Sequence, residues 1–191
     1  MIKSIILASQ SPRRRELMLL LNLPFSSENP QIEELVDPSL PIGKAIEKIA
    51  VDKALDVFNR HKHAIVIGSD TVVVLDDLVL GKPNDDEDAI RMLKLLSGKT
   101  HKVITGVCMV SDSEKIVFHS TAKVTFYPLD DALIKSYVAS SLPMDKAGAY
   151  GIQDRGALFI KAIEGDYYTI MGLPIAEVHR RLKLMEGGSG S

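Results

Sequence analysis

Strand-like runs of apolar residues alternate along this chain with apolar stripes that have helical spacing. A buried strand is predicted at residues 5–8 (IILA), and a helix follows it from residue 12. A second helix is predicted over residues 44–60, because apolar side chains recur there with the spacing of one helix face. Two β-branched strands are predicted next, at residues 64–67 and 71–74, with the segment GSD between them.

The second half of the chain continues this alternation. Its predicted elements are a helix that begins after an Asn84 cap and ends at Gly98, a hairpin of strands 101–111 and 115–127, a short helix near 130–140, a strand pair around 157–171 and a helix that begins at Pro174. Strands that alternate with helices, interrupted by one long hairpin, predict an α/β fold with a mixed sheet. We expect residues 1–185 to form a single domain, whereas residues 186–191 (EGGSGS) have the composition of an appended flexible linker.

The composition is that of an ordinary folded protein. Of 191 residues, 46% are hydrophobic and 25% are charged, which argues against intrinsic disorder. Lys and Arg number 23 against 25 Asp and Glu, so the net charge of -2 gives no overall attraction to nucleic acid or to an anionic membrane. The single cysteine, Cys108, excludes an internal disulfide and favours a reducing compartment. No segment reaches the ~18 apolar residues of a membrane span, so we expect a cytoplasmic protein.

A basic helix start is the first candidate for chemistry. In residues 9–17 (SQSPRRREL), Ser11 suits the N-cap and Pro12 suits the first helical position. The arginines at 13–15 then fall in the first turn, where the helix dipole disfavours cations. A bound phosphate would compensate, because backbone N–H groups and guanidinium groups would share it. A solvated basic turn is the alternative interpretation.

Further charged residues stand in unusual sequence surroundings. Asp70 interrupts apolar β sequence, which fits a carboxylate that is paired, binds a metal or lines a cleft, although an aspartate near glycine is also common in tight turns. Lys53 falls on the apolar stripe of its helix, and its side chain either reaches along the stripe to solvent or points into a cavity that needs positive charge. Lys82 lies in a GKP turn that would hold its backbone fixed, although a lysine in such a place is more often an ordinary surface residue. Glu33 and Glu34 form an acidic pair outside any predicted helix start.

A glycine-rich segment at residues 145–153 (DKAGAYGIQ) is the last candidate. Glycines let a backbone approach a ligand closely, and the Gln153 amide both donates and accepts hydrogen bonds. The segment matches neither a P-loop nor a dinucleotide-binding fingerprint. A purely structural loop is the alternative interpretation.

Taken together, these segments resemble the Maf family of nucleotide pyrophosphatases, the septum formation proteins. The similarity covers residues 3–182 and is carried by the motifs LASQSPRR (7–14), GSDT (68–71), GKP (81–83), LSG (96–98), MDKAGAYGIQ (144–153), GDYY (165–168) and MGLP (171–174). The resemblance implies a two-lobed α/β/α sandwich with a central mixed sheet, related to inosine triphosphate pyrophosphatases, with the nucleotide in a central cleft. It also implies hydrolysis of a nucleoside triphosphate to the monophosphate and pyrophosphate with a divalent cation.

The resemblance also assigns roles to individual residues. Asp70 matches the family's proton acceptor. Arg13, Thr71 and Gln153 match the positions tied to substrate choice, and they indicate the branch that acts on dTTP and UTP rather than on 7-methyl-GTP. The remaining cleft positions are matched by Ser9, Arg14, Glu33, Lys53 and Lys82. Ser69 departs from the alanine that is frequent at its position in the family.

These roles meet the elementary needs of such a reaction. The roughly four negative charges of a triphosphate would be offset by Mg²⁺ or Mn²⁺ and by the side chains of Arg13, Arg14, Lys53 and Lys82. Hard cations prefer carboxylate oxygens, so Glu33 and Asp70 are the candidate metal ligands. Asp70 would also orient or deprotonate the water that attacks the α-phosphorus.

Two alternatives of a different kind stay open. The chain could be a non-catalytic regulator of septum formation that binds a protein partner. The acidic and cationic candidate site residues would then have no catalytic role. Binding to nucleic acid is disfavoured by the balanced charge and by an aromatic content of 5% without tryptophan. The second alternative is a pyrophosphatase for non-standard purine nucleotides such as ITP. The sequence does not distinguish Mg²⁺ from Mn²⁺ as the preferred metal. Exposed edges of the predicted sheet would allow a homodimer.

Overall fold

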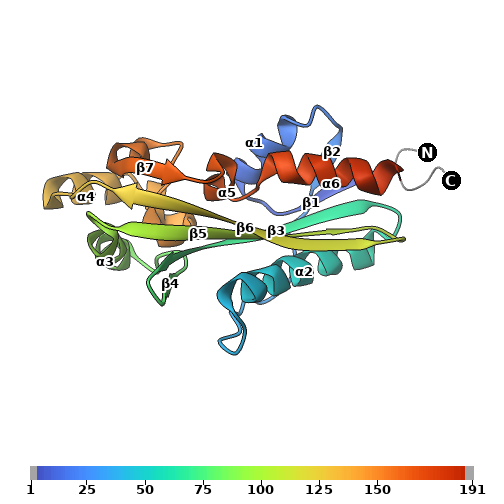
Figure 1. Ribbon diagram of the computed structural model, residues 1–191, viewed down its shortest axis with the longest axis horizontal. Coiled ribbons are helices and arrows are strands. Elements are labelled where there is room, and N and C mark those ends of the chain that lie inside the picture. Colours follow the sequence, from blue (N-terminus) through green and yellow to red (C-terminus); the bar gives the residue numbers. More distant parts are fainter. Residues whose placement is uncertain (1–3, 188–191) are drawn as a thin grey trace. The chain divides into compact units, whose positions relative to one another are not determined.

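The computed structural model describes residues 4–187, in which helices alternate with the strands of a mixed sheet (Figure 1). The strands are β1 (Ile5–Ala8), β2 (Phe25–Ser27), β3 (Ile65–Leu75), β4 (Leu78–Leu80), β5 (Thr100–Val110), β6 (Lys115–Phe126) and β7 (Ile160–Glu164). The α-helices are α1 (Pro12–Leu19), α2 (Ile42–Arg60), α3 (Asp86–Leu96), α4 (Asp131–Val138), α5 (Tyr167–Met171) and α6 (Ile175–Gly187). Short 3-10 helices cover Leu142–Asp145, Ala147–Ala149 and Arg155–Phe159.

The sheet has the strand order β2-β1-β3-β5-β6-β7, with β4 paired to β3 outside this path. Strand β1 pairs parallel with β2 and with β3, whereas β4 pairs antiparallel with β3 and β7 pairs antiparallel with β6. The short connection 111–114 joins the neighbours β5 and β6, as a hairpin requires. The predicted α/β class with a mixed sheet is therefore confirmed.

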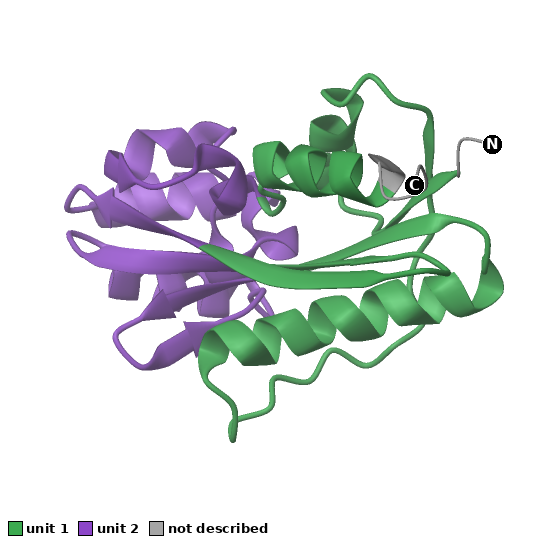
Figure 2. Ribbon diagram, turned by 45° about the vertical axis from the view of Figure 1, so that its right-hand side comes forward, with its two compact units in different colours: residues 1–70, 105–120, 172–191 green, residues 71–104, 121–171 purple. Residues whose placement is uncertain are grey.

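The chain divides into two compact units, as the family resemblance implies (Figure 2). Unit 1 comprises residues 1–70, 105–120 and 172–191, and unit 2 comprises residues 71–104 and 121–171. Strands β3, β5 and β6 each contribute residues to both units. The catalytic candidate Asp70 is the last residue of the first segment of unit 1, and Thr71 is the first residue of unit 2.

In unit 1, α2 lies on one side of the strands and α1 and α6 lie on the other (Figures 1 and 2). Helix α2 approaches β3 closely, because a Cβ atom added to Gly68 would lie 2.4 Å from the carbonyl oxygen of Ala50. The helix presents small residues at this contact, where Ala50 and Ala54 are fully buried with Val66 of β3. Tight packing of this kind fills the interior and fixes the face of α2 that carries Lys53.

The sequence predicts that the segment GSD separates two strands. In the structure this segment lies inside the continuous strand β3. The prediction was wrong because tertiary partners satisfy the polar side chains of this segment. The Ser69 hydroxyl donates to the carbonyl of Gly172, and the Asp70 carboxylate accepts from Lys53. Once paired, both side chains can be buried in a strand without the desolvation cost that makes them turn formers.

Two further predictions were wrong at helix starts. Helix α3 is capped by Asp85 rather than by Asn84, because the Asp85 carboxylate accepts a hydrogen bond from the Asp88 N–H. The second strand predicted near 157–171 is the helix α5, which follows β7 directly. The Asp166 carboxylate starts this helix by accepting from both the N–H and the hydroxyl of Thr169. The residues that follow Asp166 are aromatic or β-branched, and residues of these types favour a strand in a prediction from sequence.

The core of unit 2 is built from β3, α3, β5, β6 and α4 around a cluster of aromatic rings. His101 of β5 lies among these rings with its centroid 4.9 Å from Phe126 and 5.4 Å from Tyr150, both edge-to-face. Its Nε2 is 2.8 Å from the Tyr150 hydroxyl, and only 1% of the residue is exposed. Burial lowers the pKa of His101 to about 4, so the ring is neutral at pH 7.

We expect this histidine to make the protein sensitive to acid. An unfolded chain takes up a proton on His101 near pH 6.5, whereas the folded chain does so only near pH 4. The free energy of unfolding should therefore fall as the pH is lowered from 6.5 to 4, by ~3 kcal/mol from this residue. Urea unfolding of the wild type and of His101→Gln at pH 7, 5.5 and 4.5 measures it. Parallel stability curves for the two proteins would contradict the expectation.

Within residues 4–187, no helix is both long enough and apolar enough to cross a membrane. Of the linker predicted at 186–191, Glu186 and Gly187 belong to the last turn of α6. The other linker residues, 188–191, lie outside the described part of the chain.

Candidate active site

A buried ion pair between α2 and β3 lies at the centre of the candidate site in unit 1. Lys53 is 5% exposed and Asp70 is 8% exposed, and the Lys53 Nζ donates to the Asp70 Oδ1 over 2.8 Å. Lys53 lies on the buried face of α2, so its side chain points to a charged site instead of reaching along the apolar stripe to solvent. A buried lysine and a buried aspartate are tolerated here because each neutralises the other.

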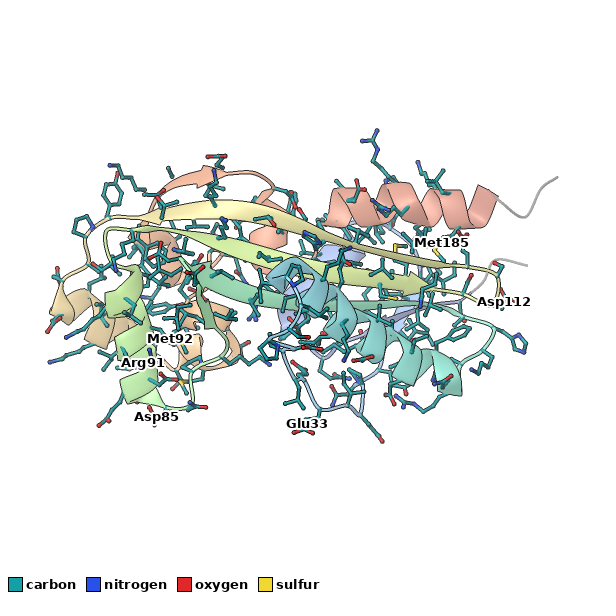
Figure 3. All side chains as sticks on the ribbon, turned by 60° about the horizontal axis from the view of Figure 1, so that its bottom comes forward. Glu33, Asp85, Arg91, Met92, Asp112 and Met185 are labelled. Carbon is teal, nitrogen blue, oxygen red and sulfur yellow. The ribbon has the colours of Figure 1, made fainter. Side chains whose placement is uncertain are left out.

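The same lysine binds a second carboxylate, that of Glu34. The Glu34 Oε1 is 2.9 Å from the Lys53 Nζ, so two carboxylates converge on one ammonium group. Glu33, which the family resemblance implies as a site residue, is exposed, and Figure 3 shows its side chain at the periphery of its loop. Glu34 is exposed as well, with 47% of its side chain accessible, and the sequence singled it out only as a member of the acidic pair. The loop after β2 is irregular, so spacing does not tell which of two neighbouring acids contacts Lys53.

The basic helix start is built as the sequence predicts, with one difference. Ser11 is the N-cap of α1 and Pro12 its first residue, but the Ser11 side chain makes no capping hydrogen bond within the described residues. Instead, the Ser9 Oγ accepts from the Ser11 N–H over 3.1 Å. Arg14 is held in place because its Nε donates to the Gly172 carbonyl over 2.8 Å and its Nη1 donates to the Ser9 Oγ over 3.4 Å.

Ser69 acquires a structural role at this point. Its hydroxyl donates over 2.8 Å to the Gly172 carbonyl, the same oxygen that accepts from Arg14. Ser69 is fully buried. An alanine at this position would remove one of the two donors named here, and Arg14 would be the other. The serine at this position therefore adds a hydrogen bond next to Asp70.

The charges in unit 1 influence one another. Burial lowers the pKa of the Arg14 guanidinium, and the neighbouring charge of Arg13 lowers it further, whereas Asp70 and Glu34 act in the opposite direction. Arginine remains charged at neutral pH under such influences. Unit 1 thus holds two fixed cations, Arg14 and Lys53, within electrostatic range of two carboxylates. This arrangement can bind an anion and offer it a carboxylate for proton transfer.

Arg13 is half-buried in the first turn of α1 in unit 1, and the other predicted site residues belong to unit 2. Thr71 is half-buried in β3, Lys82 is exposed in the turn between β4 and α3, and Gln153 is exposed in the loop before the last 3-10 helix. The chain segments that carry Lys82 and Gln153 are joined by a hydrogen bond of 3.0 Å from the Gly148 N–H to the Gly81 carbonyl. The structure thus brings the glycine-rich segment against the GKP turn.

Gly148 is required at this contact for two reasons. Its φ is +68°, a value that other residues rarely adopt, and a Cβ atom there would lie 2.8 Å from a methyl group of Val73. The sequence left open whether the glycines of the segment allow close approach to a ligand or serve a purely structural loop. Gly148 allows close approach of the segment to β3 and to the GKP turn.

Comparison with known proteins identifies the relatives of this chain. A model of the Maf-like protein family matches residues 4–185. The chain belongs to this family. Relatives named dTTP/UTP pyrophosphatase are 44% identical in Bacillus cytotoxicus (98% of each chain), 46% in Bacillus velezensis (96% of this chain, 97% of the relative) and 45% in Geobacillus sp. strain WCH70 (95% and 98%). The solved structure of the Staphylococcus aureus Ham1 protein aligns with a TM-score of 0.48 at 15% identity, over 65% of this chain and 72% of that chain.

The carboxylates of this Maf-like chain suit a cation that is shared with a substrate. Within residues 4–187, no group of three or more His, Cys, Asp and Glu side chains could hold a metal by itself. Mg²⁺, however, is commonly held by one or two carboxylates together with substrate phosphates and water. Asp70 and Glu34, which meet at Lys53, supply oxygen ligands of that kind.

Proposed function

We propose that this chain hydrolyses dTTP and UTP, and uridine triphosphates with modified bases, to the nucleoside monophosphate and pyrophosphate. The observation that carries the proposal is the buried pair of Lys53 and Asp70 near Arg14, which offers phosphate-binding cations and a carboxylate within one unit. Relatives at 44–46% identity that are named dTTP/UTP pyrophosphatase support this choice of substrate. Such an activity would remove non-standard nucleotides, and it is the activity through which a link to septum formation would arise.

In this proposal the cationic side chains bind the triphosphate. Arg14 is oriented by Gly172 and Ser9, so its guanidinium group is held in a fixed position, and a guanidinium group suits phosphate oxygens. The Ser9 hydroxyl, which accepts from the Ser11 N–H, can still donate its own proton to a phosphate. Further positive charge comes from Arg13, Lys53 and Lys82.

Asp70 acts on the attacking water. The water oxygen forms a bond to the α-phosphorus, the bond from this phosphorus to the bridging oxygen breaks, and pyrophosphate leaves. The Asp70 carboxylate orients the water and receives its proton, while the Lys53 ammonium, 2.8 Å away, holds that carboxylate in place. General-base assistance of this kind contributes ~10²–10⁴ to a rate.

The divalent cation, Mg²⁺ or Mn²⁺, is proposed to be held by Asp70 and by one carboxylate of the acidic pair. The family resemblance implies Glu33, whereas the contact of Glu34 with Lys53 favours Glu34. When bound, the cation supplies positive charge that stabilises the charge developing on the phosphates.

We also propose that the enzyme is a single Maf-like domain over residues 1–185 that acts on free nucleotides in the cytoplasm rather than on nucleic acid. The balanced charge and the single cysteine, which is buried, support this setting. Homodimer formation through exposed sheet edges is part of the same proposal, and the molar mass in solution tests it.

The test of the function is a panel of nucleotides. The purified protein is assayed with dTTP, UTP, CTP, ITP and 7-methyl-GTP in the presence of Mg²⁺ or Mn²⁺, and released pyrophosphate is measured separately from phosphate. We expect pyrophosphate from dTTP and UTP at rates well above those of the other nucleotides. Preference for ITP would instead support the purine pyrophosphatase, and no hydrolysis at all would support the non-catalytic regulator.

Gln153→Ala is expected to weaken base selection. A pyrimidine presents both donors and acceptors, and the Gln153 amide supplies both. Loss of one buried hydrogen bond costs ~1–3 kcal/mol, so the UTP:CTP ratio of kcat/KM should fall by roughly 5- to 150-fold. Steady-state kinetics with both nucleotides measure this ratio. An unchanged ratio would show that Gln153 does not recognise the base.

A further inference from the structure

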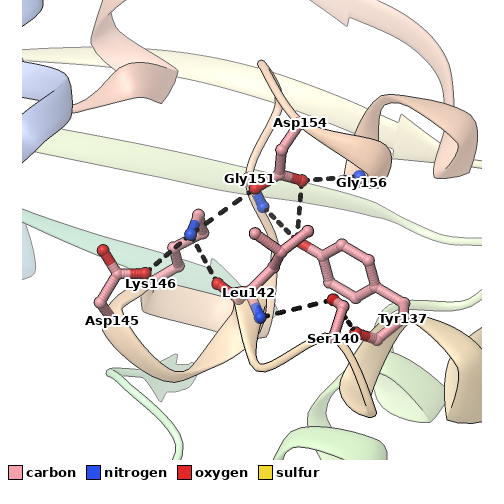
Figure 4. A network of polar contacts seen from close by, with 8 residues as sticks. All are labelled: Tyr137, Ser140, Leu142, Asp145, Lys146, Gly151, Asp154 and Gly156. Carbon is pink, nitrogen blue, oxygen red and sulfur yellow. Dashed lines mark hydrogen bonds and ion pairs between the residues drawn. The ribbon is translucent and has the colours of Figure 1, made fainter.

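The loop that carries Gln153 is closed by a single hydroxyl from a distant helix, that of Tyr137 in α4. The Gly151 N–H donates to this hydroxyl over 3.0 Å, and the hydroxyl donates to the Asp154 Oδ1 over 2.9 Å (Figure 4). Tyr137 therefore binds the residues on both sides of Ile152 and Gln153. Since Ile152 is buried and Gln153 is exposed, the loop presents the glutamine outward from a fixed base.

Tyr137 is itself held firmly. It is 1% exposed, and its ring meets Phe159 edge-to-face with centroids 4.9 Å apart. Burial is the main cause that raises the pKa of Tyr137 above its usual value, so the hydroxyl keeps the proton that it donates to Asp154. The ring position thus fixes the hydroxyl, and the hydroxyl fixes the loop.

The Asp154 carboxylate gathers the other contacts of the loop. Its Oδ1 also accepts from the Gly156 N–H over 2.8 Å, and its Oδ2 is 3.6 Å from the Nζ of Lys146. Lys146 is buried and donates to the Leu142 carbonyl and to Asp145 as well. A Cβ atom added to Gly151 would lie 2.2 Å from the Asp154 Oδ2 and 2.6 Å from the Lys146 Cε, so the network closes directly over this glycine.

We propose that Tyr137 is a positioning residue for base selection, whose hydroxyl closes loop 151–154 and thereby holds the Gln153 amide where it recognises the pyrimidine. A recognition group on a loop needs such support, because an amide misplaced by a fraction of an ångström loses its directional hydrogen bonds. The inference rests on the role of Gln153 in the proposed function and adds a residue that touches neither the base nor the phosphates.

Tyr137→Phe tests this role, because it keeps the ring and its contact with Phe159 but removes the hydroxyl. The UTP:CTP ratio of kcat/KM should fall at least ~5-fold, mainly through a higher KM for UTP, while kcat for UTP stays within about threefold of the wild type. Tyr127→Phe is the matched control, since Tyr127 is half exposed in the same unit. It should leave the ratio unchanged.

The double variant Tyr137→Phe/Gln153→Ala distinguishes positioning from general weakening of the fold. If Tyr137 acts through Gln153, the double variant should have the same UTP:CTP ratio as Gln153→Ala alone. Multiplication of the two effects would overturn the proposal, as would a folded Tyr137→Phe protein whose ratio stays within twofold of the wild type. Thermal unfolding monitors the fold of each variant.

Asp154→Ala gives an independent measurement should Tyr137→Phe fail to fold. It removes the acceptor at the other end of the same hydrogen bond and is expected to lower the ratio to a similar extent. An unchanged ratio in folded Asp154→Ala would overturn the proposal as well.

The wild type and Gln153→Ala separate this inference from the proposed function. A wild type that does not hydrolyse UTP contradicts the proposed function itself. A wild type that prefers UTP, together with a Gln153→Ala variant that has lost the preference, supports the function and leaves only Tyr137 in question. A Gln153→Ala variant that keeps the preference overturns the positioning role along with the assignment of Gln153.

Discussion

Asp70→Asn is expected to lower pyrophosphate release from dTTP by ~10²–10⁴, because the amide keeps the size of the side chain but cannot accept the proton of the attacking water. The loss should lie at the upper end of this range if Asp70 also holds the cation, and additional Mn²⁺ should then restore part of the rate. The fold should survive the change, since Lys53 keeps Glu34 as a partner at 2.9 Å.

The measurement is pyrophosphate release across a Mn²⁺ titration, with circular dichroism as the control for folding. Partial rescue by Mn²⁺ would indicate a metal-binding role in addition to proton transfer. A folded Asp70→Asn protein that hydrolyses dTTP within about threefold of the wild type would contradict the mechanism but not the fold.

The second large effect is expected at the acidic pair. Glu34→Gln should lower the rate of dTTP hydrolysis by roughly 10–100-fold and raise the metal concentration needed for half-maximal activity, because the carboxylate that meets Asp70 at Lys53 is lost. Glu33→Gln removes an equal charge from the neighbouring position, which is exposed as Glu34 is, and serves as the matched control. Its rate should stay within about threefold of the wild type.

Both variants are to be compared in one Mg²⁺ and Mn²⁺ titration, with thermal unfolding as the check on the fold. Lys53 retains Asp70 in either variant, so neither substitution leaves this lysine without a carboxylate. The opposite order, with a large loss in Glu33→Gln and little change in Glu34→Gln, would return the metal-binding role to Glu33.

Several elements could be predicted because their determinants are local in the chain. The buried strand β1, the Ser11-Pro12 start of α1 and the apolar stripe of α2 are each specified by residues within one or two turns of one another. Lys53 was also identified as unusual from this stripe, because a lysine there either reaches along the stripe to solvent or points into a cavity that needs positive charge. The stripe could not show which of the two holds, because the partner of Lys53, Asp70, lies on another element.

Two of the wrong predictions have different causes, a tertiary contact in the first and a local capping side chain in the second. The segment GSD reads as a turn, yet it continues β3 because Gly172 and Lys53 satisfy Ser69 and Asp70. The segment after Asp166 reads as a strand, yet it forms α5 because the Asp166 side chain caps its start. Propensity is a weak guide wherever a polar side chain finds a partner of this kind.

The sequence by itself determined the α/β class, the resemblance to the Maf family and the candidate residues Asp70, Lys53 and Arg14, because periodicity and motifs are properties of neighbouring residues. Only the tertiary structure decided that Glu34 rather than Glu33 contacts Lys53, and that the Tyr137 hydroxyl closes the loop of Gln153. Each of these contacts joins groups on different elements of the chain, and their geometry follows from how the loop after β2 lies against α2 in unit 1 and how α4 packs within unit 2. A charge or a hydroxyl can be read from the sequence, but the group it binds depends on which buried surfaces bring the two together.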